Sequence, residues 1–350
     1  MMYRTPPTIT DIAAAADVSR FTVSLALRNS PRVAAPTREK MQAEAARLGY
    51  RPNPTLAALM RSIRTKTRGE RKTTLGIVVA MEAPDWKGRH RYIHDICKGA
   101  QARAEELGYH MDLFTWPKSK QPGRRLQQII TARNIDGLVI APLPQLGFKL
   151  GLDFTRLSYV AIGHTLTDVA ANSVQTASFN NMRTVMEAAV TRGWRRPGII
   201  LHQRLNNAVE SRLLGAYLAY VHEHLGGLIV PPMLCDESEW TADRVVGWVK
   251  KYKVNAVIGS RTVLKDWLSE AGHVIGRDLA FAHLDCPSGS GVLAGVDQRH
   301  GEIGATAVDM LGEQLQANQR GIPRIPKVVS INGVWHDGPT MPQRRVATKA

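Results

Sequence analysis

The stretch VSRFTVSLALRNSPRV, from Val18 to Val33, decides how the N-terminal part of the chain folds. Ser19 is a favoured N-cap residue, so the stretch predicts a helix from Arg20 to about Arg28. One side of this helix is apolar and consists of Val23, Ala26 and Leu27. The opposite stripe carries Arg20, Ser24 and Arg28, with Phe21 and Leu25 beside it. The predicted fold leaves the Phe21 ring without an obvious place to be buried.

Two further helices are predicted around this segment. Thr8 and Asp11 have the spacing of a capping box and predict a short helix from Ile9 to about Ala16. A third helix is predicted from Pro36 to Leu48, ending at Gly49. Two helices joined by a tight turn, the second exposing arginines and an aromatic ring, are typical of a helix-turn-helix unit. The alternative is a small helical bundle with a solvated basic face.

The positive charge of the chain is concentrated at this end. The 350 residues carry a net charge of +16, and the first 72 hold 14 of the 46 Lys and Arg residues but only 5 of the 30 Asp and Glu residues. A basic module on a nearly neutral body indicates a polyanionic partner, most often nucleic acid.

Three segments together resemble the DNA-binding headpiece of the lactose-repressor (LacI-type) family of bacterial regulators: TITDIAAAADVS, FTVSLALRNSPRV and TREKMQAEAARLGYRPNP. The resemblance implies a headpiece over residues 1–53 that binds double-stranded operator DNA. The implied DNA-binding residues are Thr8, Arg20, Phe21, Thr22, Ser24, Leu25, Arg28, Asn29 and Arg32.

The resemblance places Arg20 and Phe21 at base edges in the major groove. Arg20 can bind a guanine through two hydrogen bonds, and Phe21 can pack on a thymine methyl group. The alternative for Phe21 is packing against the third helix. Leu25 and Arg28 depart from the family pattern, which often has Arg and Asn at these positions.

Residues 54–72 are predicted to form a hinge helix followed by a basic linker. The apolar part is too short to hold a helix alone in water, so DNA is expected to order it. The resemblance implies that Leu56 and Ala58 line the minor groove and that Leu59 wedges between central base pairs.

From Thr74 onward, strand-like and helical runs alternate, and the alternation occurs twice. This pattern predicts two doubly wound lobes with parallel sheets, and it resembles the periplasmic-binding-protein-like core of the same family. The fold class is therefore α plus α/β, with the two-lobed effector-binding and dimerisation core over residues 73–340. Lobe one is expected over about 73–163 plus 292–320, and lobe two over about 164–291 plus 321–340. Residues 341–350 are expected to be a disordered basic tail.

The cleft between the lobes is predicted to bind a small-molecule effector. The resemblance places effector contacts at Arg212, Trp240, Asp285 and Gln298, with His164 and Asn180 as further candidates. Two alternatives stay open, since Arg212 can pair with Asp285 and Trp240 can belong to the core. The expected effector is a sugar or sugar derivative; a purine-like or anionic corepressor is the alternative.

The sequence also argues against several other kinds of site and protein class. Cys97, Cys235 and Cys286 match no metal-site spacing and are predicted to be reduced packing residues, and no metal or cofactor is expected. No catalytic motif, membrane span or signal peptide is recognised, so the expected protein is a cytoplasmic regulator and not an enzyme. It is expected to be a repressor that binds a pseudo-palindromic operator as a homodimer or higher oligomer. A solute-binding protein and an architectural DNA binder without an effector are the competing classes.

Overall fold

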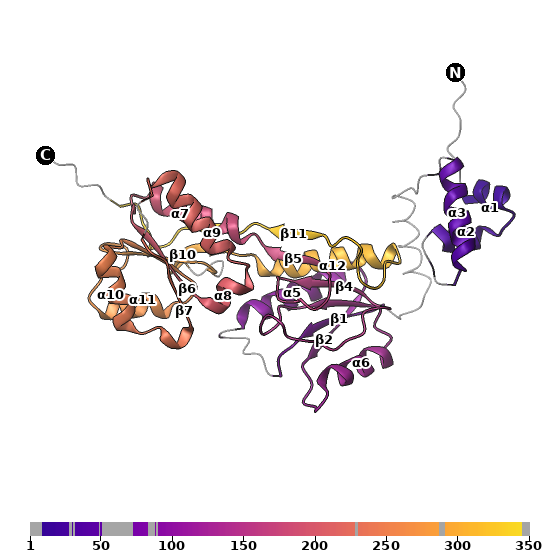
Figure 1. Ribbon diagram of the computed structural model, residues 1–350, viewed down its shortest axis with the longest axis horizontal. Helices are drawn as coiled ribbons and strands as arrows, with labels where there is room; N and C mark the ends of the chain where they lie inside the picture. Colours follow the sequence, from indigo (N-terminus) through magenta and orange to yellow (C-terminus); the bar gives the residue numbers. More distant parts are fainter. Residues whose placement is uncertain are drawn as a thin grey trace, which may run out of the picture.

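The computed structural model describes residues 9–27, 30, 32–48, 50, 73–82, 88, 90–227, 230–286 and 291–344. The headpiece consists of α1 (Ile9–Ala16), α2 (Arg20–Leu27) and α3 (Ala35–Leu48), which pack on one another (Figure 1). Its core is built around Ile12, Val23, Ala26 and Met41, all of which are fully buried. The three helices predicted from the sequence are thus confirmed.

The boundary between α1 and α2 follows from local chemistry. The Ser19 Oγ accepts a hydrogen bond from the Thr22 backbone N–H at 3.1 Å, which is the N-cap geometry that the sequence predicts. Ala13 and Ala16 are buried, and their small side chains let α2 approach α1 closely. α2 spans Arg20–Leu27, and Arg28, near the predicted end, lies outside the described residues.

Lobe one contains a parallel six-stranded sheet with the strand order β11-β5-β4-β3-β1-β2. The strands are β1 (Thr74–Val79), β2 (His110–Thr115), β3 (Gly137–Ile140), β4 (Ser158–Ile162), β5 (Asn172–Thr176) and β11 (Val328–Ile331). α5 (Arg91–Glu106) and α12 (His300–Gln316) contribute to one apolar core, and α6 (Pro122–Ala132) contributes to a second core. The near-continuous burial of β1, β3 and β4 fits a parallel sheet covered on both faces.

Lobe two repeats this plan with the order β12-β10-β9-β8-β6-β7. Its strands are β6 (Pro197–His202), β7 (Met233–Cys235), β8 (Ala256–Gly259), β9 (Ala280–His283), β10 (Ala294–Asp297) and β12 (Val334–His336), of which β12 is antiparallel to β10. Its helices are α7 (Ser178–Thr191), α8 (Gln203–Ala208), α9 (Arg212–His224), α10 (Ala242–Tyr252) and α11 (Val263–Glu270), with a short 3₁₀ helix, η1 (Glu237–Glu239). α7 and α9 contribute to one core, and α10 and α11 to the other. The prediction of two doubly wound lobes is confirmed.

The predicted lobe boundaries need correction. β5 pairs with β4 in the sheet of lobe one, although residues 164–291 were assigned to lobe two. Similarly, β10 pairs with β9 in lobe two, and β11 pairs with β5 in lobe one. The chain therefore crosses between the lobes three times, after β5, β10 and β11. Strand pairing between segments far apart in the chain, which periodicity does not record, sets these boundaries.

The start of the C-terminal tail is also corrected. Met341 is buried in the core of lobe two, where Trp194 donates a hydrogen bond from Nε1 to the Pro342 carbonyl at 2.8 Å. Arg344 donates its backbone N–H to the Arg192 carbonyl. Residues 341–344 thus pack on lobe two, and the rest of the predicted disordered tail lies outside the described residues.

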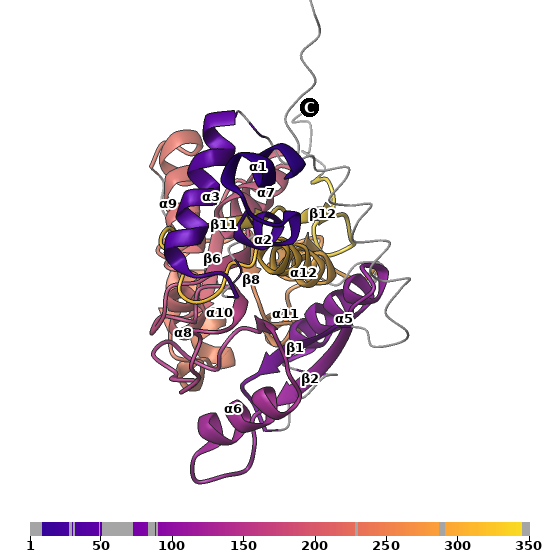
Figure 2. The ribbon, with the colours of Figure 1, turned by 90° about the vertical axis from the view of Figure 1, so that its right-hand side faces the viewer.

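α5 and α12 lie against each other along lobe one (Figures 1 and 2). Glycines make this approach possible, since a Cβ atom on Gly304 would lie 2.1 Å from the Ile96 carbonyl oxygen. A Cβ on Gly99 would lie 2.0 Å from the Gly301 carbonyl oxygen. The backbones of the two helices therefore lie in close contact.

Cys97, Cys235 and Cys286 are buried free thiols, as predicted. Burial raises the pKa of the Cys97 thiol to about 12, so this group stays protonated at neutral pH. Among the described helices, none combines the length and the apolar character that crossing a membrane requires.

Candidate nucleic-acid interface and interlobe cleft

The exposed face of α2 presents an arginine and an aromatic ring together. Arg20 is exposed, and 67% of the surface of Phe21 is accessible to solvent. The alternative in which Phe21 packs against α3 is therefore wrong. The Phe21 ring and the Arg20 guanidinium are thus both accessible to another molecule.

The neighbouring candidates of the headpiece differ in their surroundings. The Thr22 and Ser19 hydroxyl groups are hydrogen bonded at 2.9 Å. Ser24 is half-buried, Arg32 is exposed, and Leu25 packs partly against the headpiece core. The remaining predicted DNA contacts lie outside the described residues; they are Thr8, Arg28, Asn29, Leu56, Ala58 and Leu59.

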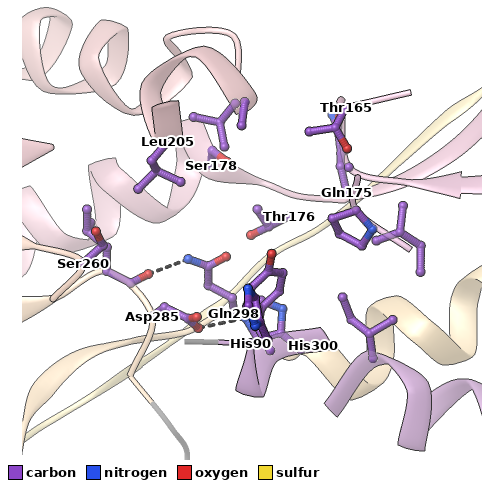
Figure 3. Close-up of a pocket in the computed structure, with 18 of the residues that line it drawn as sticks. His90, Thr165, Gln175, Thr176, Ser178, Leu205, Ser260, Asp285, Gln298 and His300 are labelled. Carbon is purple, nitrogen blue, oxygen red and sulfur yellow. Dashed lines mark hydrogen bonds and ion pairs between the residues drawn. The ribbon is translucent and has the colours of Figure 1, made fainter. Parts of the chain in front are cut away.

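A cleft of about 1490 Å³ separates the two lobes. Loops after the carboxyl ends of β3, β4, β6, β8 and β9 line it, which is the place where parallel α/β sheets bind ligands. Figure 3 shows side chains of both lobes meeting there, including Gln175 of lobe one and Ser260 of lobe two. The cleft predicted from the sequence is thus present.

Three of the six predicted effector residues line this cleft, namely His164, Asp285 and Gln298. Gln298 donates a hydrogen bond from Nε2 to the Leu284 carbonyl at 2.6 Å (Figure 3). This bond fixes the side chain at the point where the chain leaves β10 for α12. The effector-binding roles of these residues stay predictions.

The Asp285 carboxylate pairs with His300 across the cleft, with 2.9 Å between Oδ1 and Nε2 (Figure 3). Burial opposes the ionisation of Asp285, but the charge and the hydrogen bond of His300 hold the pKa of this carboxyl below its usual range. Burial likewise disfavours the charged imidazole, yet Asp285 raises the pKa of His300 above its ordinary value. The predicted alternative, in which Arg212 pairs with Asp285, is therefore wrong.

Arg212 pairs instead with Glu210, at 2.7 Å between Nη2 and Oε2. Glu210 also lies 3.4 Å from the Nδ1 of His164, which comes from the other lobe. Burial lowers the pKa of His164, an effect that outweighs the opposing charge of Glu210. Arg212 is not among the residues that line the cleft, so the structure places it beside the cleft rather than in its wall.

Trp240 and Asn180 also lie away from the wall. Trp240 is buried in a core of lobe two, with its ring centroid 5.8 Å from that of His202, which itself lines the cleft. The core alternative for Trp240 is thus the correct one, because the indole is buried among apolar side chains of lobe two. Asn180 is on the exposed side of α7 and donates a hydrogen bond to the Asn332 side chain at 3.0 Å.

Sequence reasoning missed the cleft residues whose polar atoms lack partners. Among the described residues, four buried side-chain atoms of the cleft have no hydrogen-bond partner: His164 Nε2, Gln175 Oε1, Ser260 Oγ and His300 Nδ1. Of their residues, only His164 was predicted. The position of Ser260 at the end of a predicted strand was a usable signal, whereas Gln175 lies on a strand that the sequence did not reveal. The described part of the chain contains no cluster of three or more side chains suited to a metal ion.

The chain thus combines a helix-turn-helix headpiece with two parallel-sheet lobes that enclose a polar cleft. Residues 8–53 match the family described as "Bacterial regulatory proteins, lacI family". The headpiece belongs to this family, and the resemblance predicted from its sequence is confirmed.

The curated relatives are transcriptional regulators and not enzymes. The chain is 28% identical over 167 residues to the HTH-type transcriptional regulator MalR of Staphylococcus xylosus, a match that covers 46% of this chain and 45% of that protein. It is 29% identical over 149 residues to the HTH-type transcriptional repressor CytR of Escherichia coli, covering 43% of this chain and 38% of that protein. The chain thus spans less than half the length of the curated relatives it matches.

Solved structures extend the likeness of fold to the whole chain. The transcriptional regulator CelR in complex with cellobiose superposes with a TM-score of 0.57 at 18% identity, covering 95% of this chain and 99% of that one. A lac repressor dimer bound to operator and an anti-inducer superposes with a TM-score of 0.56 at 20% identity. This match covers 97% of the present chain and 100% of the repressor chain. These structures share the fold of the present chain.

Proposed function

We propose that this protein is a sequence-specific transcriptional regulator that binds a pseudo-palindromic operator as a dimer and acts as a repressor. The observation that carries the proposal is the exposed Arg20 and Phe21 pair on the second helix of a lacI-family headpiece. Arg20 supplies donors for a guanine edge, and the Phe21 ring supplies an apolar surface for a thymine methyl group. The basic N-terminal region adds sequence-independent attraction to phosphates.

We further propose that a small molecule in the interlobe cleft controls DNA binding. The cleft has room for such a ligand, and both lobes contribute polar groups to it, so a ligand can bind one arrangement of the lobes better than the other. Three predicted residues remain as direct contacts, namely His164, Asp285 and Gln298. Since Trp240 lies behind the wall and Asp285 is already paired, a sugar would depend on hydrogen bonds more than on stacking.

The experiment that tests DNA recognition is selection of bound duplexes from a random library by the full-length protein. The proposal expects enrichment of a two-fold symmetric site whose half-sites contain a guanine and a thymine. Enrichment of no symmetric site, with binding that follows only the salt concentration, would contradict it.

Effector control is tested by thermal unfolding in the presence of sugars, sugar acids and nucleosides. A ligand present at about 100 times its dissociation constant stabilises the folded state by about 2.7 kcal/mol. A stabilising ligand that also changes the affinity for the selected duplex supports control through the cleft. A ligand that stabilises the protein without changing DNA affinity favours the solute-binding alternative.

A further inference from the structure

Two histidines of lobe one face carboxylates of lobe two across the cleft. His300, the first residue of α12, pairs with Asp285 at 2.9 Å, and His164, after β4, lies 3.4 Å from Glu210. The His300 side chain is 13% exposed, so water has little access to this contact. An ion pair between the lobes in a partly desolvated place links the separation of the lobes to the charge of the imidazole.

We propose that His300 and Asp285 form a proton-controlled clasp that holds the two lobes together when the imidazole is charged and weakens when it loses its proton. The pair joins α12, which packs on lobe one, to the loop after β9 of lobe two. α12 packs closely on α5, where Gly301 and Gly304 lie at the contact. Breaking the clasp therefore frees Asp285 and the loop after β9 to move relative to α12 and lobe one.

The groups around the pair determine the direction of the pH dependence. Asp95 of α5 and Asp297 of β10 favour the charged form of His300, and the Tyr92 ring lies 5.7 Å from the imidazole. On the other side, His283 and Arg91 act on Asp285. Because the pKa of His300 is raised, its stabilising contribution is complete below the usual pKa of histidine, near 6.5, and is lost as the pH rises through the higher folded value.

His164 provides a matched control within the same cleft. Burial lowers the pKa of this residue, so His164 loses its proton at a lower pH than His300 does. Removing His164 should leave the response of the lobes unchanged in the pH range where His300 titrates. The two histidines thus separate a titrating clasp from interlobe packing in general.

The test is the distance between the lobes in the full chain, measured by fluorescence energy transfer. Dyes are attached to Gln128→Cys in α6 and Lys250→Cys in α10, which are exposed positions on opposite lobes, while the native thiols are buried. The clasp predicts a shorter distance at pH 5.5 than at pH 8.5, with a midpoint above 6.5. The change should be absent in His300→Gln, whose amide does not titrate in this range, and retained in His164→Gln.

An unchanged distance in the parent protein, or a response that survives His300→Gln, would overturn the clasp. A second measurement follows the imidazole signal of His300 by NMR in the full chain with labelled histidine, where Asp285→Asn should lower the titration midpoint of His300. A midpoint that does not move would also overturn the proposal. The role of the clasp in gene control rests on the proposed function, but the distance and the titration do not, so either can fail without the other.

Discussion

Phe21 is a large apolar side chain that the headpiece leaves largely in solvent. Solvent exposure of such a ring has no benefit for folding, because hydrophobic burial is the main favourable term. The neighbouring Val23 and Ala26 are fully buried, so α2 has both a core face and an outward face. The position of Phe21 is explained if the DNA duplex covers the ring.

Phe21→Ala should reduce the affinity of the dimer for the symmetric site by about 15-fold, since one methyl contact in each of the two half-sites contributes about 0.8 kcal/mol, or about 1.6 kcal/mol together. The matched measurement replaces the contacted thymine by uracil, which removes only the methyl group. The parent protein should lose affinity on the uracil duplex, and Phe21→Ala should bind both duplexes alike. Equal losses for the two proteins on uracil would show that the ring does not contact this methyl.

Arg20→Ala should lose about 1–3 kcal/mol of discrimination at one guanine in each half-site. The control is Arg47→Ala, since Arg47 is an exposed arginine of α3 that pairs with Glu44 of its own helix. Competition binding with every base at that position measures the discrimination. If both substitutions weaken all duplexes alike, Arg20 contacts phosphates and not a base edge.

The sequence was sufficient for the headpiece residues but not for the cleft. Ser19, Val23 and Phe21 were placed correctly because caps and helical periodicity depend on neighbours in the chain. Trp240 and Asn180 were misplaced because their surroundings come from distant elements. A tryptophan contributes as well to a core as to a ligand-stacking surface, and only the packing decides between the two.

At the scale of elements, α2 depends on its cap. Ser19→Ala should destabilise the headpiece by about 1 kcal/mol, because the Thr22 backbone N–H loses its acceptor. Thr241→Ala is the matched control, since the Thr241 hydroxyl caps α10 in lobe two by accepting from the Arg244 backbone N–H. Hydrogen exchange followed along the chain should show faster opening of residues 20–27 in the first variant and of residues 242–252 in the second. Faster exchange in the same region for both variants would contradict independent caps.

The contact between α5 and α12 depends on glycines at the helix interface. Gly304→Ala should destabilise lobe one by about 1–3 kcal/mol or more, because the new methyl group would meet the Ile96 carbonyl. Gly215 of α9 has open space around it, since a Cβ atom added there would meet no heavy atom of another part of the chain within 4 Å. Gly215→Ala should therefore stabilise the folded state by about 0.5–1 kcal/mol. Urea unfolding of the two variants measures both effects. A neutral Gly304→Ala would mean that the helices separate easily.

Alternation of apolar strand-like and helical runs sufficed to predict the layered lobes, but not every strand. β5 carries the sequence NSVQT, whose polar residues conceal a strand that is held on both sides by β4 and β11. β7 and β12 have three residues each, too few for a period to be recognised. The three predicted crossings between the lobes were therefore placed one strand too early, before β5, β10 and β11 instead of after them.

At the scale of the whole molecule, the chain combines the exposed face of α2 in the headpiece with a cleft between lobe one and lobe two. Three crossings connect the lobes, and residues of both line the cleft, so a ligand or proton that binds one arrangement of the lobes better than another changes their separation. The headpiece is attached at the start of lobe one, and a change in lobe arrangement in each subunit of a dimer would alter the spacing of two headpieces. In this way the proposed effector and the proposed operator would be coupled.

The most direct measurement is the affinity of the full-length protein for its selected duplex relative to a scrambled duplex of the same composition, at one fixed salt concentration near 150 mM. For a regulator that recognises sequence, the ratio should be about 10³ or more, and a duplex with one half-site should bind far more weakly than the symmetric duplex. A ratio within about tenfold of unity would contradict base recognition by α2 and leave only the attraction of a basic protein to a polyanion.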